Sequence, residues 1–334
     1  MMETARRHWL RGAGAGLATA LLGRAAQAQA PVAVRPEAQP ESAVLLMPGP
    51  EGGAAMRWAE GVAAGLVRGM PHLMVMRPQV LGGPDGVTAA NRFATLGAGN
   101  GRTLLVLPGQ AAHLRLVGES RAQFSPEAWL PLCVSWQGAV LGGRGAWPPT
   151  SPLRLALPSP DAPEASALLA LDLMGVPATP VFTRNQPPED SLARGQADAM
   201  VLSGPAPLRL ARQAGLTPWL ELETPGRREH PQLPSTAATS GPAAALEAMQ
   251  AGFAALHLRA ALMLPELTAA DTVASWRRAA LRWQEEESRQ PAEAGVPALV
   301  GAEARAVMAS LFPAPPAMLA YREWLLRRLS WQAG

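Results

Sequence analysis

The sequence predicts an α/β protein of two lobes, each a mainly parallel sheet flanked by helices, with a helical C-terminal segment. Three observations support this fold class. Short apolar runs alternate with amphipathic runs, which is the order of strand and crossover helix in a parallel sheet. The alternation comes in two series, joined by a long apolar stretch at residues 129–142. The remainder of the chain has mainly helical periodicity.

In the first series, Gly- and Pro-rich turns separate the predicted elements. Residues 43–47, 73–76 and 103–107 are short apolar runs and predict buried strands. Residues 54–70 predict an amphipathic helix, and residues 86–96 a second one. The apolar face of the longer helix consists of Met56, Ala59, Ala63, Leu66 and Met70.

The second series follows a turn-rich segment at residues 143–151. Its predicted strands are 153–157, 179–182 and 199–202, and its predicted helices are 163–174, 189–195 and 206–214. Helices at 242–260, 269–290, 302–311 and 316–330 follow, with one strand at 261–264. We therefore expect residues 41–140 and 240–334 in one lobe and residues 141–239 in the other.

The N-terminus has the pattern of an export signal. Arg6 and Arg7 lie in a basic segment, a weakly apolar run follows, and small residues precede Ala28, where we expect cleavage. The order Arg-Arg-x-aromatic-Leu is typical of a twin-arginine signal, which indicates the periplasm. The alternative is an ordinary amphipathic helix. Residues 29–40 are polar and Pro-rich and predict a linker.

Charge and composition exclude several function classes. All 29 basic residues are Arg, so lysine chemistry is absent. Without residues 1–28, which carry 4 Arg and 1 acid, 25 Arg face 25 acids, and this balance argues against nucleic acid as a partner. The lone Cys133 and five scattered histidines predict no metal site. No apolar run is long enough to span a membrane. The sequence predicts no cofactor.

Three turns follow predicted strands and lead into predicted helices. They are Pro48-Gly49-Pro50-Glu51-Gly52-Gly53, Pro158-Ser159-Pro160-Asp161-Ala162-Pro163 and Ser203-Gly204-Pro205. Free amides at a helix start attract carboxylates, and open α/β sheets bind ligands at the carboxyl ends of their strands. The alternatives are plain turns, with Asp161 as an N-cap.

No catalytic motif is present, and Cys133 lies in an apolar run that predicts a packing role. The glycine-rich segment at residues 97–101 follows a helix and precedes a strand. That order favours a helix C-cap over a phosphate loop.

The ordered motifs resemble the substrate-binding proteins of tripartite tricarboxylate transporters, often called the Bug family. That family has Pro-x-Pro-x-Gly-Gly between its first strand and helix, as at residues 48–53. Further matching segments are Gly101-Arg102-Thr103-Leu104-Leu105, Gly195-Gln196-Ala197-Asp198, His230-Pro231-Gln232-Leu233-Pro234-Ser235 and residues 263–269. The chain departs from the family at Met56, where an Asp is frequent.

The resemblance implies a type II periplasmic-binding fold that closes on a small organic acid or amino acid. It implies that the closed form delivers this ligand to integral membrane transporter subunits, and that the chain is a monomer and not an enzyme. A sensor docking a signalling protein, and an exported hydrolase using Ser159 or Asp161, are the alternatives. The implied ligand-binding residues are Pro50, Glu51, Gly52, Gly53, Ser159, Pro160, Asp161, Ala162, Phe182 and Ser203.

Overall fold

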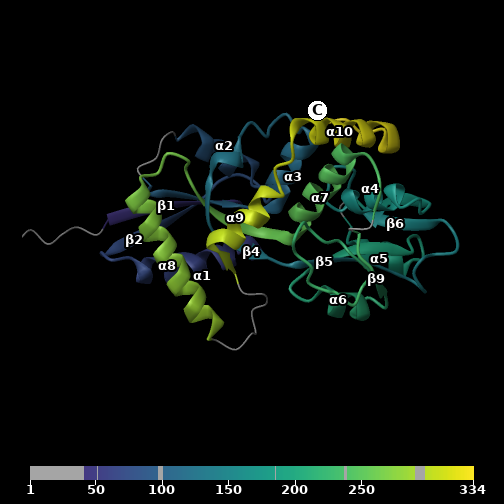
Figure 1. The fold of residues 1–334 in the computed structure, drawn as a ribbon, viewed down its shortest axis with the longest axis horizontal. Helices are drawn as coiled ribbons and strands as arrows, with labels where there is room; N and C mark the ends of the chain where they lie inside the picture. Colours follow the sequence, from purple (N-terminus) through teal and green to yellow (C-terminus); the bar gives the residue numbers. More distant parts are fainter. Residues whose placement is uncertain (1–40, 51, 97–100, 185, 237–238, 290–297) are drawn as a thin grey trace, which may run out of the picture. The chain divides into compact units, whose positions relative to one another are not determined.

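The computed structural model describes residues 41–50, 52–96, 101–184, 186–236, 239–289 and 298–334. The expected signal peptide and linker, Glu51, and residues 97–100 of the glycine-rich segment lie outside these ranges. Inside them the strands form two sheets, with helices packed around each (Figure 1). None of the helices in this part of the chain is both long and apolar enough to cross a membrane.

The first sheet is mixed. Its strands are β1 (Glu41–Met47), β2 (Met74–Val80), β3 (Thr103–Leu107), β4 (Leu130–Trp136), β10 (Leu258–Leu264) and β11 (Leu299–Val300), in the spatial order β11-β4-β10-β3-β1-β2. β1 is parallel to β2 and β3, while β10 runs antiparallel to both β3 and β4. The carboxyl ends of β1 to β4 therefore share one edge of the sheet with the amino end of β10.

The helices α1 (Ala54–Gly69) and α8 (Ala270–Ser288) pack against each other on one face of this sheet (Figure 1). The buried face of α1 consists of Met56, Ala59, Val62 and Leu66. The sequence predicted Met56, Ala59 and Leu66 correctly, whereas the predicted Ala63 and Met70 are only partly buried. The buried Trp276 of α8 donates a 2.9 Å hydrogen bond from its indole N–H to the carbonyl oxygen of Gly101.

The second sheet is also mixed. Its strands are β5 (Gly138–Gly143), β6 (Leu153–Leu157), β7 (Ala178–Phe182), β8 (Ala199–Gly204) and β9 (Thr217–Glu221), in the order β7-β6-β8-β5-β9. β6 is parallel to β7 and β8, and β5 is antiparallel to β8 and β9. The helices α4 (Ala165–Leu173), α5 (Pro188–Ala193) and α6 (Pro207–Gln213) follow β6, β7 and β8.

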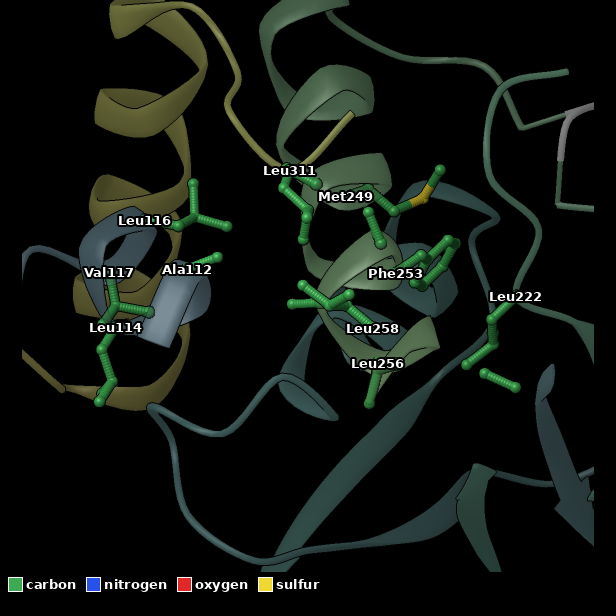
Figure 2. Packing of buried hydrophobic residues seen from close by; sticks show 14 of the residues in the cluster. Ala112, Leu114, Leu116, Val117, Leu222, Met249, Phe253, Leu256, Leu258 and Leu311 are labelled. Atoms are coloured by element: carbon green, nitrogen blue, oxygen red, sulfur yellow. The ribbon is translucent and has the colours of Figure 1, made fainter. Parts of the chain in front are cut away.

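The chain passes from the first sheet to the second at Gln137, between β4 and β5, and returns after Leu222 through α7 (Ala243–His257). The side chain of His257 contacts both of these connecting segments. Its Nδ1 lies 2.5 Å from the carbonyl oxygen of Gln137, and its Nε2 lies 2.6 Å from that of Leu222. Figure 2 shows Met249, Phe253 and Leu256 of α7 in the apolar cluster that also contains Leu222.

The C-terminal helix α10 (Pro315–Leu329) packs on α3 (Gly109–Val117) and α7. Arg322 donates to the carbonyl oxygens of Leu116 and Arg115 at the end of α3, at 3.1 and 3.0 Å. Further along α10, Trp324 and Arg328 donate to the carboxylate of Asp172 in α4, at 2.9 and 3.0 Å. Helix α10 is thus hydrogen-bonded to α3, which follows a strand of the first sheet, and to α4, which follows a strand of the second sheet.

Several elements differ from the sequence-based expectations. The helix α3 and the strand β9 were not predicted. The predicted helix 242–260 is wrong at its end, because it stops at His257. Leu258 and Ala260 instead pair with Trp136 and Ser135 of β4, so β10 begins three residues earlier than the predicted strand 261–264.

Candidate ligand-binding cleft

A cavity of about 420 Å³ opens where the carboxyl ends of β1, β3 and β4 face the second sheet. The first sheet contributes the turn after β1, the turn after β3, and the start of β10. The second sheet contributes Ser203 from the end of β8, and the segment before α4 contributes Pro163 and Glu164. The full lining is Pro48, Gly49, Pro50, Gly53, Ala55, Met56, Pro84, Pro108, Gly109, Gln110, Gln137, Pro163, Glu164, Ser203, Ala255, Leu256, Leu258 and Arg259.

Three helix N-termini border this cavity. The first turns of α1 and α3 contribute Ala55 and Gln110, and α4 contributes its N-cap residue, Glu164. In the described residues, no side chain caps any of these three helices, but the first three amides of α4 already donate to the carbonyl oxygens of Ala162, Pro163 and Glu164. The unpartnered amides are therefore those of α1 and α3. The first amides of a helix have no partner within the helix and carry a partial positive charge. The cavity wall is therefore suited to a carboxylate.

The turn after β1 is held by its own contacts. The amide of Gly53 donates to the carbonyl oxygen of Pro50 at 3.3 Å, and the amide of Gly52 donates to the thioether of Met56 at 3.3 Å. Gly52 has a φ of +76°, which a glycine adopts without strain. Met56, which stands where the resembled family often has Asp, thus closes the turn with a neutral acceptor and adds no negative charge to the cavity.

A second cavity of about 510 Å³ adjoins the first, and Gln137 and Arg259 line both. It runs between α1, the end of β4 and α8. Besides the two shared residues it is lined by Arg57, Trp58, Gly61, Val62, Arg68, Ser135, Trp136, Pro205, Trp283, Glu286 and Glu287. Gln137 and Arg259 therefore belong to the wall of each cavity.

Burial shifts the pKa of ionisable groups in the cleft. It raises the pKa of Glu164, and it raises the pKa of Glu287, because a carboxylate loses hydration there. The pKa of Arg259 is lowered, first by burial and then by the neighbouring charge of Arg57. The acidic groups thus lose some of their tendency to ionise, while two guanidinium groups lie close enough to interact.

The structure brings some of the expected site residues together and leaves others outside the lining. Pro50, Gly53 and Ser203 line the first cavity, with Gly52 exposed in the same turn. Ser159, Pro160, Asp161 and Ala162 lie in the correct turn, but the residues of that turn that line the cavity are the next two, Pro163 and Glu164. Phe182 ends the edge strand β7, is 37% exposed, and does not line the cavity.

Sequence reasoning missed Gly109, Gln110, Gln137, Glu164 and Arg259. One signal for the first two was available, since Pro108-Gly109 directly follows a strand in the same manner as the turn after β1. Gln137 and Arg259 carry no comparable signal. Their neighbours in the cleft are set by the pairing of β4 with β10, which are more than a hundred residues apart in the chain.

No protein-family model matches the sequence, and no curated protein is similar to it in sequence. Solved structures do resemble it. A TctC solute-binding protein from Polaromonas gives a TM-score of 0.62 at 16% identity, over 86% of this chain and 98% of the other. MatC from Rhodopseudomonas palustris with bound malate gives 0.53 at 18% identity, over 85% and 99% of the two chains. A further R. palustris protein, with adipate, gives 0.53 at 19%, over 86% and 97%.

The chain has the fold of the periplasmic solute-binding proteins. The predicted α/β fold with two lobes and a helical C-terminal segment is therefore confirmed, and so is the resemblance in fold to a TctC solute-binding protein and to MatC. Cys133 is fully buried in β4, as expected of a packing residue. In the described part of the chain, no group of three or more His, Cys, Asp or Glu side chains is arranged to hold a metal.

Proposed function

We propose that this chain is a periplasmic receptor that captures a small carboxylated molecule in the cleft. The observation that carries the proposal is the convergence of two uncapped helix N-termini, those of α1 and α3, on one cavity. Each supplies amides without intrahelical partners, which are suited to an anion. Two proteins of the same fold have malate and adipate bound, which supports an organic acid as the ligand class.

Capture proceeds by closure of two lobes about the chain passages at Gln137 and Leu222. The proposed lobes are residues 41–140 with 240–334, and residues 141–239. β5 pairs with β8 and β9 of the second sheet, so the bending point lies at Gln137. Closure brings Glu164 and Ser203 toward the turns after β1 and β3. The closed form is the one that integral membrane transporter subunits recognise, because ligand and lobe contacts are complete only there.

The proposed ligand contacts are those expected from the sequence, Pro50, Glu51, Gly52, Gly53, Ser159, Pro160, Asp161, Ala162, Phe182 and Ser203. To these we add the lining residues Gly109, Gln110, Gln137 and Glu164, because they face the same cavity.

A thermal-shift screen of the mature protein tests the function. Malate, adipate, their singly acidic analogues, amino acids, amines and neutral sugars are compared, and hits are confirmed by titration calorimetry. An organic acid should raise the melting temperature by mass action. If only amines or neutral solutes raise it, the carboxylate assignment is wrong.

We also propose export by the twin-arginine route. The twin-arginine route recognises an arginine pair, here Arg6 and Arg7. Replacing both with Lys in the full precursor should leave the protein in the cytoplasm. A matched Arg24→Lys variant should be exported normally. Unchanged export of the double variant would mean that the chain uses another route.

A further inference from the structure

The first cavity has walls of opposite chemistry. On one side, Ala55 and Gln110 belong to the first turns of α1 and α3, whose amides carry a partial positive charge. On the other side, the first amides of α4 are already bonded within their own turn, so the group that α4 adds to the lining is the acidic residue Glu164. One wall is thus suited to an anion, and the opposite wall carries an acid.

The carboxyl group of Glu164 has no positively charged partner in the part of the chain that the structure describes. Burial raises its pKa, and a hydrogen bond with its own backbone amide opposes that effect. Arg259 also lines the cavity, but the neighbouring charge that shifts its pKa is that of Arg57. A carboxylate that has lost hydration without gaining a partner is costly, so a positive group of a ligand would be stabilised beside Glu164.

Three titratable side chains near Glu164 supply no positive charge. The charges of Glu164 and Asp161 raise the pKa of the buried Tyr321 hydroxyl, in addition to the larger effect of burial. His113 of α3 packs edge-on against Tyr321, with ring centroids 5.7 Å apart, and burial lowers its pKa to about 3. At neutral pH neither ring is charged, so these neighbours leave the acid at the start of α4 unbalanced.

We propose that Glu164 is a specificity-determining residue that selects a ligand with an ammonium group as well as a carboxylate. The carboxylate lies at the N-termini of α1 and α3, and the ammonium group pairs with Glu164. Since α1 and α3 follow strands of the first sheet and α4 follows a strand of the second, the two ends of this ligand bridge the sheets. The ligand class is then amino acids and not plain organic acids. This inference rests on the proposed function, because it assigns the second charged group of the same ligand.

Titration calorimetry on the mature protein with matched ligands tests the assignment. L-Aspartate is compared with L-malate, in which a hydroxyl group replaces the ammonium group, and 6-aminohexanoate is compared with hexanoate, which lacks it. Hexylamine has the ammonium group without the carboxylate. The variants are Glu164→Gln and Glu164→Asp, and Glu189→Gln, at an exposed acid in the first turn of α5, is the matched control. Circular dichroism and the melting temperature establish that each variant is folded.

We expect the amino acid of at least one pair to bind roughly tenfold or more tightly than its plain acid. Glu164→Gln should weaken binding of that amino acid by roughly tenfold or more, and it should strengthen binding of the plain acid, because a repulsion is removed. Glu164→Asp should weaken the amino acid less, since it keeps the charge on a shorter side chain. Glu189→Gln should change either affinity by less than about twofold, and hexylamine should bind more weakly than 6-aminohexanoate.

The outcomes distinguish this inference from the proposed function. If the wild-type protein binds plain acids as tightly as amino acids, no ammonium group is selected, so the inference is wrong and the receptor function stands. If Glu164→Gln binds the preferred amino acid as tightly as the wild type does, Glu164 is not the selecting residue, and the inference is again overturned. If hexylamine binds as tightly as 6-aminohexanoate, or if none of the four acids binds, the proposed function fails and takes the inference with it.

Discussion

The imidazole of His257 lies parallel to the indole of Trp136, with ring centroids 5.2 Å apart and an angle of 14° between the planes. Both residues are buried, and they belong to the two segments by which the chain enters and leaves the second sheet. The ring nitrogens of His257 face the carbonyl oxygens of Gln137 and Leu222. The His257 side chain therefore links the two connections between the sheets.

His257→Phe keeps a ring against Trp136 and removes both nitrogens. We expect it to lower the free energy of unfolding by about 1–3 kcal/mol, because a hydrogen bond to a buried carbonyl oxygen is lost. His257→Ala also loses the stack and leaves a cavity, for a total of about 3–5 kcal/mol. Urea denaturation measures both. His72→Phe, at an exposed histidine, is the control. A His257→Phe protein as stable as the wild type would show that the contacts of the ring nitrogens with Gln137 and Leu222 do not stabilise the fold.

Ala55→Asp places a carboxylate in the first turn of α1, inside the first cavity. The helix dipole stabilises an acid at this position by about 0.3–1 kcal/mol, so the melting temperature should not fall. Acid binding should weaken at least tenfold, because the new carboxylate occupies the amides and repels the ligand. Ala302→Asp, in the exposed first turn of α9 (Gly301–Ala309), is the matched control and should bind normally. Retained binding by the Ala55→Asp protein would remove α1 from the site.

The affinity for acids should depend on pH through Glu164. Its pKa is raised by burial, so on going from a neutral to a mildly acidic pH it takes up a proton before a ligand with an ordinary carboxyl pKa does. The repulsion between Glu164 and the ligand then disappears, and binding should tighten. Glu164→Gln should bind acids more tightly at pH 7 and lose this pH dependence. Calorimetry at both pH values measures the effect, and weaker binding by Glu164→Gln would mean that Glu164 attracts the ligand.

His113 should make the fold sensitive to acid. Burial lowers its pKa from the ordinary value of 6.5 to about 3, which the nearby backbone of Ala162 opposes only in part. Neither ring nitrogen has a hydrogen-bond partner among the described residues. Below pH 6.5 the unfolded chain takes up a proton that the folded protein does not accept until about pH 3, so stability falls as the pH falls through this range.

His113→Leu should therefore flatten the loss of stability between pH 6.5 and 4, and at neutral pH it should cost little, because two unpaired polar atoms are removed. Urea denaturation over this range is the measurement, with the exposed His72→Leu as the comparison. A slope identical to that of the wild type would assign the acid sensitivity to other groups.

Much of the fold could be predicted from local patterns. The strands at residues 103–107 and 153–157 have the predicted bounds, because each is a short, mainly apolar run between turn residues. The helix α3 was missed because it is buried on almost every side, so it has no amphipathic stripe to reveal it. β9 was missed because it contains Pro218, a residue that argues against a strand.

The candidate site was predictable where it depends on short segments. The turns after β1 and β6 were placed correctly, because a turn between a strand and a helix is a local feature. The neighbours of Gln137 and Arg259 were not, because they depend on which distant strands pair. Which residues of the turn before α4 line the cavity also depends on where the helix begins. The structure places Glu164 in the cavity lining, whereas the sequence predicted Asp161.

The two attachments of α10 have a practical consequence. Arg322 fastens it to the helix after β3, and Arg328 fastens it to the helix after β6. Any change in the angle between the sheets must therefore break one attachment or move the whole helix. The end of α10 is therefore expected to move when the angle between the two sheets changes. A fluorophore there, paired with a second one on the exposed side of α8, would convert cleft closure into an optical signal and make the protein a reagent-free sensor.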